Sequence, residues 1–586
     1  MQTIDLIAAA VCVLSCGALW LLAERADRIK STKWKLLWLL PPVLAFVITK
    51  RGPELSLLPL YLGAVIAALG FFTEMKQRRQ RLAAAGAVCM LLSIPVCVLN
   101  PRYRAKSYLK DFETLFSCMR EHYVLTEHKG IDWDALYAEY QPQFAEIDRT
   151  QDAGRNALVW GAFSGEFHDG HVGYSYSKED NDAAAAAIKA ALGNDYGLSV
   201  MRCSDGSFAA VNTDESLAAY GIHNGTVITK WDGKAPDEVS KSSPAYGLST
   251  FVADQDGHIL LHLDSYPDID NEIFWSGLLA AGVGGESVTV TYLDDSGAEQ
   301  TAVLPKTGEY FERCRDTVNT INQGIESANL AWSKINETTA CLRIKGMSYD
   351  MKSYNSAEDD AFNEMKDELR STILQYQEEG VRDVIIDLRS NEGGSPHMVD
   401  GVVSMFAPKG EYVNMLTGVW DEEHHKWATD ENGNYIKGKE IKFQGEQLLG
   451  DGRVILLVNS ETVSAGDDMV KIMSDMENVT ILGFTQPNGS CQAVNFQSAD
   501  FGTLSFSSCV TLDQDGSIFI DSGKDRQSTD GDAVQIVPFD AAAIHALFDR
   551  VGRTDSHMST ATEESCSYLV RWAEENQCPV LYGNRN

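Results

Sequence analysis

The sequence predicts an α/β domain built on a layered sheet, and the main evidence is two buried-type strands that each end in a polar, glycine-containing turn. The first is Val384–Leu388, followed by Arg389–Gly394, and the second is Val454–Val458, followed by residues 459–467. Continuous apolar runs of this length are typical of central strands in a sheet that is covered on both faces. Strands and helical patterns alternate around them, which favours right-handed crossover connections.

Each element follows from apolar periodicity or from an apolar run bounded by turn residues. We expect strands at 341–344, 384–388, 454–458 and 478–483, and helices at 358–379, from Met398 and from Ala465. A β pair is expected at 504–512 and 517–521. Upstream, apolar residues three and four positions apart predict helices at 108–123, 133–147 and 152–166, and an alanine run predicts another at 182–192.

The first hundred residues contain four apolar stretches, at 4–23, 36–49, 55–73 and 82–99. Three approach the ~20 residues that a membrane-spanning helix needs, and the second is shorter and contains two prolines. A cleaved signal peptide is the alternative for the first stretch, which lacks a basic start. We therefore expect four transmembrane helices within residues 1–105. The basic loops at 25–35 and 76–81 should be cytoplasmic, which predicts a multi-pass protein of the cell membrane with residues 106–586 outside the cytoplasm.

Charge is distributed unevenly along the chain. Of the 49 Lys and Arg and the 83 Asp and Glu, residues 1–105 hold 13 and 5, which leaves 36 and 78 for the rest. Binding to nucleic acid needs positive charge to contact the phosphates, so the acidic part excludes this class of function. The sequence has no Cys/His cluster of the zinc type, and we expect no metal or other cofactor.

Residues 194–306 resemble a PDZ-type module. Tyr196–Val200 resembles its carboxylate-binding loop, 218–234 resembles its glycine-containing centre, and 287–293 would be its closing strand. A PDZ groove binds a peptide by adding it as a strand, with the terminal carboxylate held by backbone N–H groups. The resemblance therefore implies a module that selects peptide substrates. The alternative is a degenerate PDZ fold kept for packing, and the length of 242–283 indicates an insertion.

Two strings in strand context carry a family resemblance, DLRSNEGG at 387–394 and SAGD at 464–467. Together and in this order they resemble the motifs of the C-terminal processing (tail-specific) proteases and their relatives, the tricorn-core peptidases. The resemblance extends from about residue 106 to residue 548. It implies a serine peptidase with a crotonase- and ClpP-like layered core.

The nucleophile and the oxyanion hole follow from this resemblance. Ser464 is the first residue of SAGD, at the expected start of a helix, and would attack the scissile carbonyl. The backbone N–H groups of Ala465 and of Gly393 or Gly394 would stabilise the oxyanion, because glycine lets the chain approach the substrate without a Cβ clash.

The base that deprotonates Ser464 should be a histidine. One branch of the family uses a lysine in the turn after the serine helix, but no lysine lies between Lys471 and Lys524. Lys471 itself is two helical turns from the serine, too far to reach it. The tricorn-like branch uses a histidine in a DGH motif, which is present at 169–171. His171 is therefore the expected base.

The third catalytic member should be an acid at the end of a strand, where the family usually has Glu. Asp521 lies 57 residues after Ser464 in such a context, and Asp525 and Asp530 are the alternatives. Four other polar residues near the motifs have weaker claims. His168 is a local competitor for the base, whereas His397, Asp387 and Arg389 are expected to be structural, the last two as an ion pair.

The sequence thus predicts a membrane-anchored serine endopeptidase that acts on protein or peptide substrates, with its oligomeric state left open. The expected parts are a membrane domain at 1–105, a helical subdomain at 106–193, the PDZ-like module at 194–306, an α/β serine peptidase domain at 307–548 and a tail at 549–586. The alternative is a catalytically inactive peptide- or ligand-binding protein on the same scaffold, because a fold does not guarantee a function.

Overall fold

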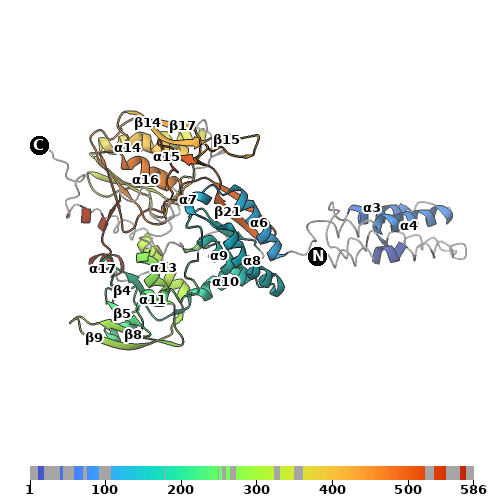
Figure 1. The fold of residues 1–586 in the computed structure, drawn as a ribbon, viewed down its shortest axis with the longest axis horizontal. Helices are drawn as coiled ribbons and strands as arrows, with labels where there is room; N and C mark the ends of the chain where they lie inside the picture. Colours follow the sequence, from blue (N-terminus) through green and yellow to red (C-terminus); the bar gives the residue numbers. More distant parts are fainter. Residues whose placement is uncertain are drawn as a thin grey trace. The chain divides into compact units, whose positions relative to one another are not determined.

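The computed structural model of the chain divides into two compact units, Met1–Lys106 and Ser107–Asn586 (Figure 1). In the larger unit the structure describes residues 107–549 except 179, 249, 254–258, 264–271, 323–329, 349–359 and 522–533, together with 568, 569, 571–573 and 575. In the smaller unit it describes residues 58–69 and 76–91, together with 11–16, 18, 21, 40, 41 and 43.

The described residues within 1–105 contain none of the expected transmembrane helices. The longer described helices there are α3 (Leu58–Ala68) and α4 (Lys76–Leu91). At 1.5 Å per residue, the 11 residues of α3 span about 16 Å, roughly half the apolar thickness of a bilayer. Helix α4 begins inside the basic segment 76–81, so its first part is charged. Among the described residues, no helix combines the length and the apolar character needed to cross a membrane.

The predictions that depended on those helices are therefore wrong. They are the fold class with four transmembrane helices, and the localisation as a multi-pass membrane protein with an extracytoplasmic catalytic part. The physical reason is that the apolar content of a stretch does not determine where a helix begins. Helix α4 includes residues 76–81, which we expected to form a loop. Most of the stretches 4–23 and 36–49, and all of 92–99, lie outside the described residues.

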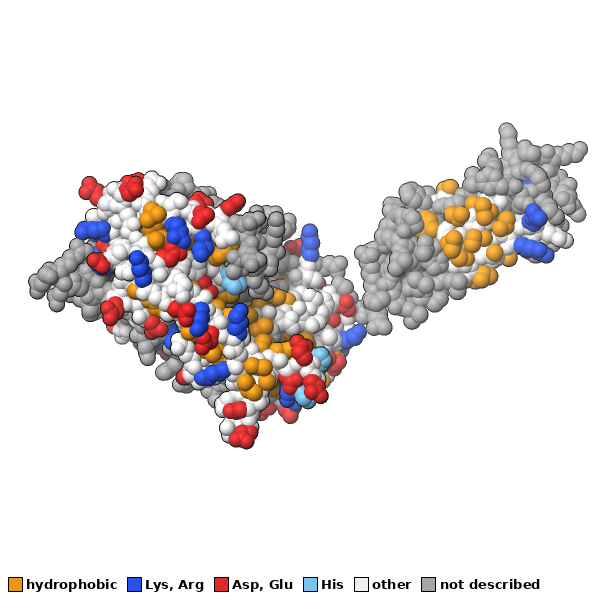
Figure 2. All heavy atoms as spheres, turned by 90° about the horizontal axis from the view of Figure 1, so that it is seen from above, with side chains coloured by type: hydrophobic (Ala, Val, Ile, Leu, Met, Phe, Trp, Pro, Cys, Tyr) orange, Lys and Arg blue, Asp and Glu red, His pale blue; other side chains and the backbone are white. Residues whose placement is uncertain are grey.

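Helices α3 and α4 pack closely through two glycines. An ideal Cβ on Gly63 would lie 2.6 Å from the Gly86 carbonyl oxygen, and one on Gly86 would lie 2.7 Å from that of Gly63. A larger residue at either position would force the helices apart. Figure 2 shows apolar side chains gathered over this unit, whereas charged side chains of both signs are spread over the visible face of the larger unit.

The larger unit is organised around a six-stranded sheet in the order β11-β12-β13-β18-β19-β23. The strands are β11 (Leu330–Lys334), β12 (Thr339–Ile344), β13 (Asp383–Asp387), β18 (Val454–Leu457), β19 (Val479–Gly483) and β23 (Val534–Ile536). β11 pairs antiparallel with β12, and the other neighbours pair in parallel. The strands predicted from residues 341, 384, 454 and 478 are confirmed as β12, β13, β18 and β19.

Three helices cover one face of this sheet, at the places that the sequence predicts. They are α14 (Asp360–Glu378), α15 (Pro396–Phe406) and α16 (Ala465–Ser474). Along β13, Val384 and Ile386 belong to the core beneath these helices, whereas Ile385 belongs to the core on the opposite face. Alternating side chains bury the strand on both sides, which explains its continuous apolar run.

The segment before residue 193 is mainly helical. Its helices are α6 (Tyr108–His122), α7 (Thr126–Lys129), α8 (Trp133–Thr150), α9 (Ala153–Gly165) and α10 (Asn181–Leu192), and the sequence predicts all of them except α7. Strand β1 (Gly173–Tyr176) pairs with β21 (Gly502–Ser507), and β21 pairs with β20 (Val494–Ser498). The sequence does not predict the β1–β21 pairing, which brings the DGH motif beside the α/β part.

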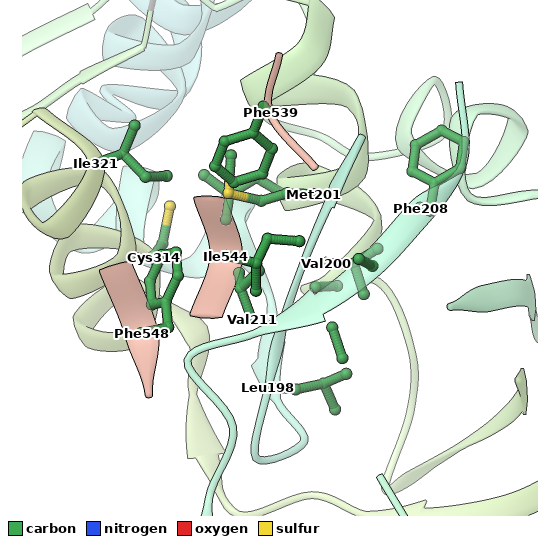
Figure 3. Close-up of a cluster of buried hydrophobic side chains, with 14 of the residues drawn as sticks. Leu198, Val200, Met201, Phe208, Val211, Cys314, Ile321, Phe539, Ile544 and Phe548 are labelled. Atoms are coloured by element: carbon green, nitrogen blue, oxygen red, sulfur yellow. The ribbon is translucent and has the colours of Figure 1, made fainter. Parts of the chain in front are cut away.

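The module at 194–306 shares its core with the helix at 541–548. Its elements are β2 (Asn194–Asp195), β3 (Ser199–Arg202), β4 (Phe208–Val211), the 3₁₀ helix η6 (Glu215–Tyr220), β5 (Ile228–Trp231), α11 (Pro236–Ser240), β6 (Thr250–Ala253), β7 (Ile259–Leu263), α12 (Glu272–Ala281), β8 (Ser287–Leu293) and β9 (Glu299–Pro305), followed by β10 (Gly308–Glu309) and α13 (Tyr310–Asn322). Strand β8 lies at the place where the sequence predicts a strand, 287–293. Figure 3 shows Ile544 and Phe548 of α17 (Ala541–Phe548) in one apolar cluster with Val200 and Val211.

A further sheet lies beside the α/β core, in the order β17-β14-β22. Its strands are β14 (Gly410–Gly418), β17 (Lys437–Gly445) and β22 (Thr511–Leu512), and a hairpin of β15 (Trp420–Asp421) and β16 (Lys426–Trp427) extends from it. The β pair expected at 504–512 and 517–521 is found only as a bridge between Leu512 and Ile518, because β21 pairs elsewhere.

Candidate active site

Ser464 lies between the end of β18 and the first residue of α16, where the sequence predicts it. Its φ of 62° and ψ of −121° are rare for a residue with a side chain, and strain of this kind is concentrated at functional sites. The Ser464 N–H donates to the Ser490 carbonyl over 2.9 Å and to an Asp467 carboxylate oxygen over 3.0 Å. These bonds fix a partly exposed serine at the start of a helix.

The loop after β13 packs directly against Ser464. Gly393 has a φ of 79°, and an ideal Cβ on it would lie 2.5 Å from the Ser464 Cβ. The same Cβ would lie 3.0 Å from the Ala465 nitrogen, so a glycine is needed to leave room beside this N–H group. The two loops meet because β13 and β18 are parallel neighbours whose carboxyl ends reach the same edge of the sheet.

The three N–H groups predicted to form the oxyanion hole differ in their hydrogen bonds. The Gly393 N–H donates to the Asn391 side-chain oxygen over 2.9 Å. In the part of the chain that the structure describes, the N–H groups of Gly394 and Ala465 have no acceptor. Ala465 is the first residue of α16, a position whose N–H has no partner within the helix. Gly394 and Ala465 are therefore available as donors, and Gly393 leaves the space beside them.

The loop that carries His171 reaches the same place through Ser490. The Gly170 N–H donates to the Ser490 hydroxyl over 2.9 Å, while the Ser490 carbonyl accepts from the Ser464 N–H. An ideal Cβ on Gly170 would lie 2.3 Å from the Asn488 side-chain oxygen, which explains the glycine of the DGH motif. One residue thus contacts both the serine turn and the histidine loop.

Asp169 fixes the conformation of the histidine loop. It is 3% exposed, and its carboxylate accepts hydrogen bonds from the His171 N–H over 2.9 Å and from the hydroxyls of Tyr123 and Ser507 over 3.0 and 2.9 Å. Burial lowers the pKa of His171, Asp169 opposes this shift, and Lys129 adds to it. The imidazole is therefore neutral at neutral pH, which is the form that accepts a proton.

Asp521 is paired with a lysine that the sequence did not single out. Its Oδ1 atom lies 2.5 Å from the Lys129 Nζ, and the two side chains are 0% and 2% exposed. Burial raises the pKa of Asp521 to about 8, Lys129 acts in the opposite direction, and Asp169 adds to the rise. Among the described residues, neither carboxylate oxygen of Asp521 nor His171 Nδ1 has a hydrogen bond, so the two side chains are not joined directly.

The remaining predicted residues take structural positions. Arg389 binds Asp387 through two hydrogen bonds of 2.9 and 2.7 Å, which confirms the predicted ion pair. Lys471 lies 3.6 Å from Asp513, and His397 lies in the first turn of α15. Asp525 and Asp530 lie outside the described residues. Within the described ranges, no group of three or more His, Cys, Asp and Glu side chains could hold a metal ion.

Comparisons with known proteins agree with this arrangement. Residues 338–521 match the model of peptidase family S41, and residues 104–153 match the model of the tricorn protease C1 domain. Two proteins of Staphylococcus epidermidis, each named "Probable CtpA-like serine protease", are 26% and 28% identical to this chain over 150 and 116 residues. These matches cover 25% and 20% of this chain, and 28% and 21% of the relatives, so the chain spans about a quarter of their length.

A similar fold occurs in mature CPAF complexed with lactacystin, with a TM-score of 0.50 and 14% identity over 82% of this chain and 99% of that one. A second structure, of mature CPAF, also gives a TM-score of 0.50 and 14% identity. At 14% identity the similarity concerns the fold alone. The region with the family match includes Ser464, the diglycine and Asp521. Residues 338–521 are therefore similar to peptidase family S41, and this match together with the CtpA-like relatives supports a serine peptidase.

Proposed function

We propose that this protein is an endopeptidase that hydrolyses peptide bonds with Ser464 as the nucleophile and His171 as the general base. The observation that carries the proposal is the position of Ser490, which accepts hydrogen bonds from the backbones of both Ser464 and Gly170. Because His171 follows Gly170 directly, the serine turn and the backbone of the loop that carries His171 are joined through hydrogen bonds to Ser490.

The chemistry follows from these positions. The neutral imidazole of His171 takes the Ser464 proton as the hydroxyl attacks the substrate carbonyl, and it then gives the proton to the leaving amine. The N–H groups of Ala465 and Gly394 stabilise the negative charge on the carbonyl oxygen. Water then hydrolyses the acyl-enzyme in a second step that uses the same base.

The proposal extends to substrate selection by the module at 194–306, but only for a state in which α12 has moved. Cys203 N–H donates to the Ser207 carbonyl, so the alternating ladder leaves the backbones of Val200 and Arg202 on the outer edge of β3. An ideal Cβ on Gly277 of α12 would lie 3.1 Å from both the Val200 carbonyl oxygen and the Arg202 nitrogen. The helix therefore occupies the edge to which a peptide strand would add.

A fluorophosphonate probe tests the nucleophile. Ser464→Ala should abolish both labelling and peptide hydrolysis without lowering the free energy of unfolding. Ser474→Ala is the matched control, because Ser474 lies at the other end of α16 and its hydroxyl donates to the Lys471 carbonyl. Full labelling of Ser464→Ala would refute the assignment. Absence of labelling in the unmodified protein would favour the inactive binding protein instead.

A further inference from the structure

Lys129 is a buried cation beside the proposed catalytic residues. It is the last residue of the short helix α7, and its side chain is 2% exposed. Its Nζ atom lies 2.5 Å from Asp521 Oδ1 and donates a hydrogen bond of 2.7 Å to the His168 carbonyl. The ammonium group thus joins the loop that ends at Asp521 to the loop that carries His171.

This arrangement differs from a direct Ser–His–Asp triad. In such a triad the acid accepts a hydrogen bond from the imidazole and holds its orientation. Here Asp521 makes no hydrogen bond to His171 within the described residues, and its carboxyl group faces the Lys129 ammonium instead. The side chain of the acid therefore reaches the histidine loop through the lysine, which contacts the backbone of that loop at His168.

We infer that Lys129 is a positioning residue, whose ammonium links the Asp521 carboxyl group to the backbone of the His171 loop and so replaces the direct acid–imidazole bond. This inference rests on the proposed function. Lys129 contacts no reacting atom, and its role is to fix the position and the electrostatic surroundings of the base.

The charges around His171 give the inference a measurable consequence. The charged groups that act on it are Asp169 on its own loop and Lys129 on α7, and Lys129 is paired with Asp521. His128 also contacts Asp521, because its Nε2 atom lies 3.3 Å from the Asp521 carbonyl oxygen. Removal of the Lys129 charge takes away a repulsion on the protonated imidazole while Asp169 remains, so the pKa of His171 should rise.

The test compares Lys129→Met with Lys129→Arg and with Lys471→Met, a lysine outside the site that pairs with Asp513. Lys129→Met should lower kcat about 100-fold, as expected for a misplaced catalytic group. It should also shift the acid limb of the kcat/KM profile to higher pH. Lys129→Arg should retain the position of that limb, and Lys471→Met should change neither quantity. An unchanged kcat and pH profile in Lys129→Met would overturn the inference.

A double variant separates positioning from folding, because Lys129→Met leaves Asp521 buried without its partner and can fail to fold. Lys129→Met with Asp521→Asn removes both ionisable groups and should recover the thermal stability of the unmodified protein while kcat stays low. Recovery of both stability and kcat would show a purely structural pair and overturn the inference. Failure of the proposed function has a different signature, since Ser464→Ala would then label as well as the unmodified protein.

Discussion

The Gly170 N–H donates a hydrogen bond to the Ser490 hydroxyl over 2.9 Å, although the two residues are 320 positions apart in the sequence. Ser490 also accepts from the Ser464 N–H through its carbonyl, and its own N–H donates to Asp467 over 3.2 Å. A small, fully buried residue thus contacts both the turn of the proposed nucleophile and the loop of the proposed base, and it has no part in the proposed chemistry.

Ser490→Ala should slow catalysis without preventing folding. Loss of the hydroxyl leaves the Gly170 N–H without its acceptor, which should cost about 1–3 kcal/mol of unfolding free energy. A small displacement of the His171 loop should lower kcat at least tenfold. Ser505→Ala is the matched control, because the Ser505 hydroxyl of β21 donates over 3.1 Å to the carbonyl of Gly173, the first residue of β1 after the DGH motif. Equal losses of kcat in the two variants, measured by peptide hydrolysis, would contradict the role of Ser490.

Gly393→Ala should abolish activity and destabilise the protein. The new Cβ would lie 2.5 Å from the Ser464 Cβ, and a φ of 79° is unfavourable for alanine. Gly433→Ala separates the two causes, because Gly433 has a φ of 88° and nothing within 4 Å of its ideal Cβ. We expect Gly433→Ala to lower the free energy of unfolding by roughly 1 kcal/mol through backbone strain alone. Gly393→Ala should lower it by about 1–3 kcal/mol more, through overpacking. Chemical denaturation and probe labelling measure these effects, and equal destabilisation of the two variants would exclude close packing on Ser464.

His171 should give the enzyme an acid limb below the ordinary imidazole pKa of about 6.5, because burial lowers the pKa of this residue. The neutral form is the active base, so kcat/KM should be constant at neutral pH and fall only when the pH drops below that value. The same depressed pKa makes the folded state bind fewer protons than the unfolded state. The contribution to stability is therefore complete above pH 6.5 and is lost as the pH falls toward the folded pKa.

His171→Ala should lower kcat by about 10⁴-fold or more, because the serine loses its base. Lys471→Ala should have no effect, since its ammonium faces Asp513 on the outer side of α16. If Lys471→Ala silenced the enzyme and His171→Ala were mild, the Ser–His assignment would be wrong.

Asp387→Asn should be one of the most destabilising changes in the sheet. Burial would raise the pKa of Asp387, but Arg343 and Arg389 outweigh it and hold that pKa below its usual value. Loss of the carboxylate leaves two buried guanidinium groups without their partner, which should cost about 3–5 kcal/mol. Asp383→Asn at the other end of β13 should cost less, because the Arg453 side chain that it pairs with is 26% exposed. Denaturation of both variants at neutral pH checks the difference.

The contribution of Asp387 to stability also depends on pH, but its pKa is lowered by neighbouring arginines, whereas that of His171 is lowered by burial. Because the folded pKa of Asp387 is depressed, the contribution is complete above the ordinary carboxyl pKa of about 3.9 and is lost as the pH falls toward the folded value. The difference in stability between Asp387→Asn and the unmodified protein should therefore narrow only in strong acid.

The sequence predicted the elements whose signal is local. Residues 384–386 and Val454–Leu457 are continuous apolar runs because both faces of these strands are buried. The position of Ser464 follows from the strand before it and the helix after it. The β1–β21 pairing joins residues near 174 and 504, so no local pattern predicts it. Lys129 gave no signal either, because a lysine at the end of a four-residue helix has the sequence context of an exposed residue.

The prediction of transmembrane helices failed for a related reason. The count of apolar residues in 55–73 and 82–99 is high, but α3 ends at Ala68 and α4 begins at Lys76. Helix α4 contains Arg78, Arg79 and Arg81, which lie in a segment that hydropathy alone predicts to be a loop. Where a helix begins depends on its backbone hydrogen bonds and neighbours, which a sum over apolar residues does not contain.

The apolar cluster shared by β3, β4 and α17 has a consequence for the order of events during synthesis (Figure 3). Phe208 on β4 leaves the ribosome about 340 residues before Phe548, so the nascent module exposes the face that α17 later covers. At a typical translation rate of about 5–20 residues per second, that face stays uncovered for tens of seconds. The module therefore cannot complete its core until nearly the whole chain has been made, and folding of the two regions is coupled in time.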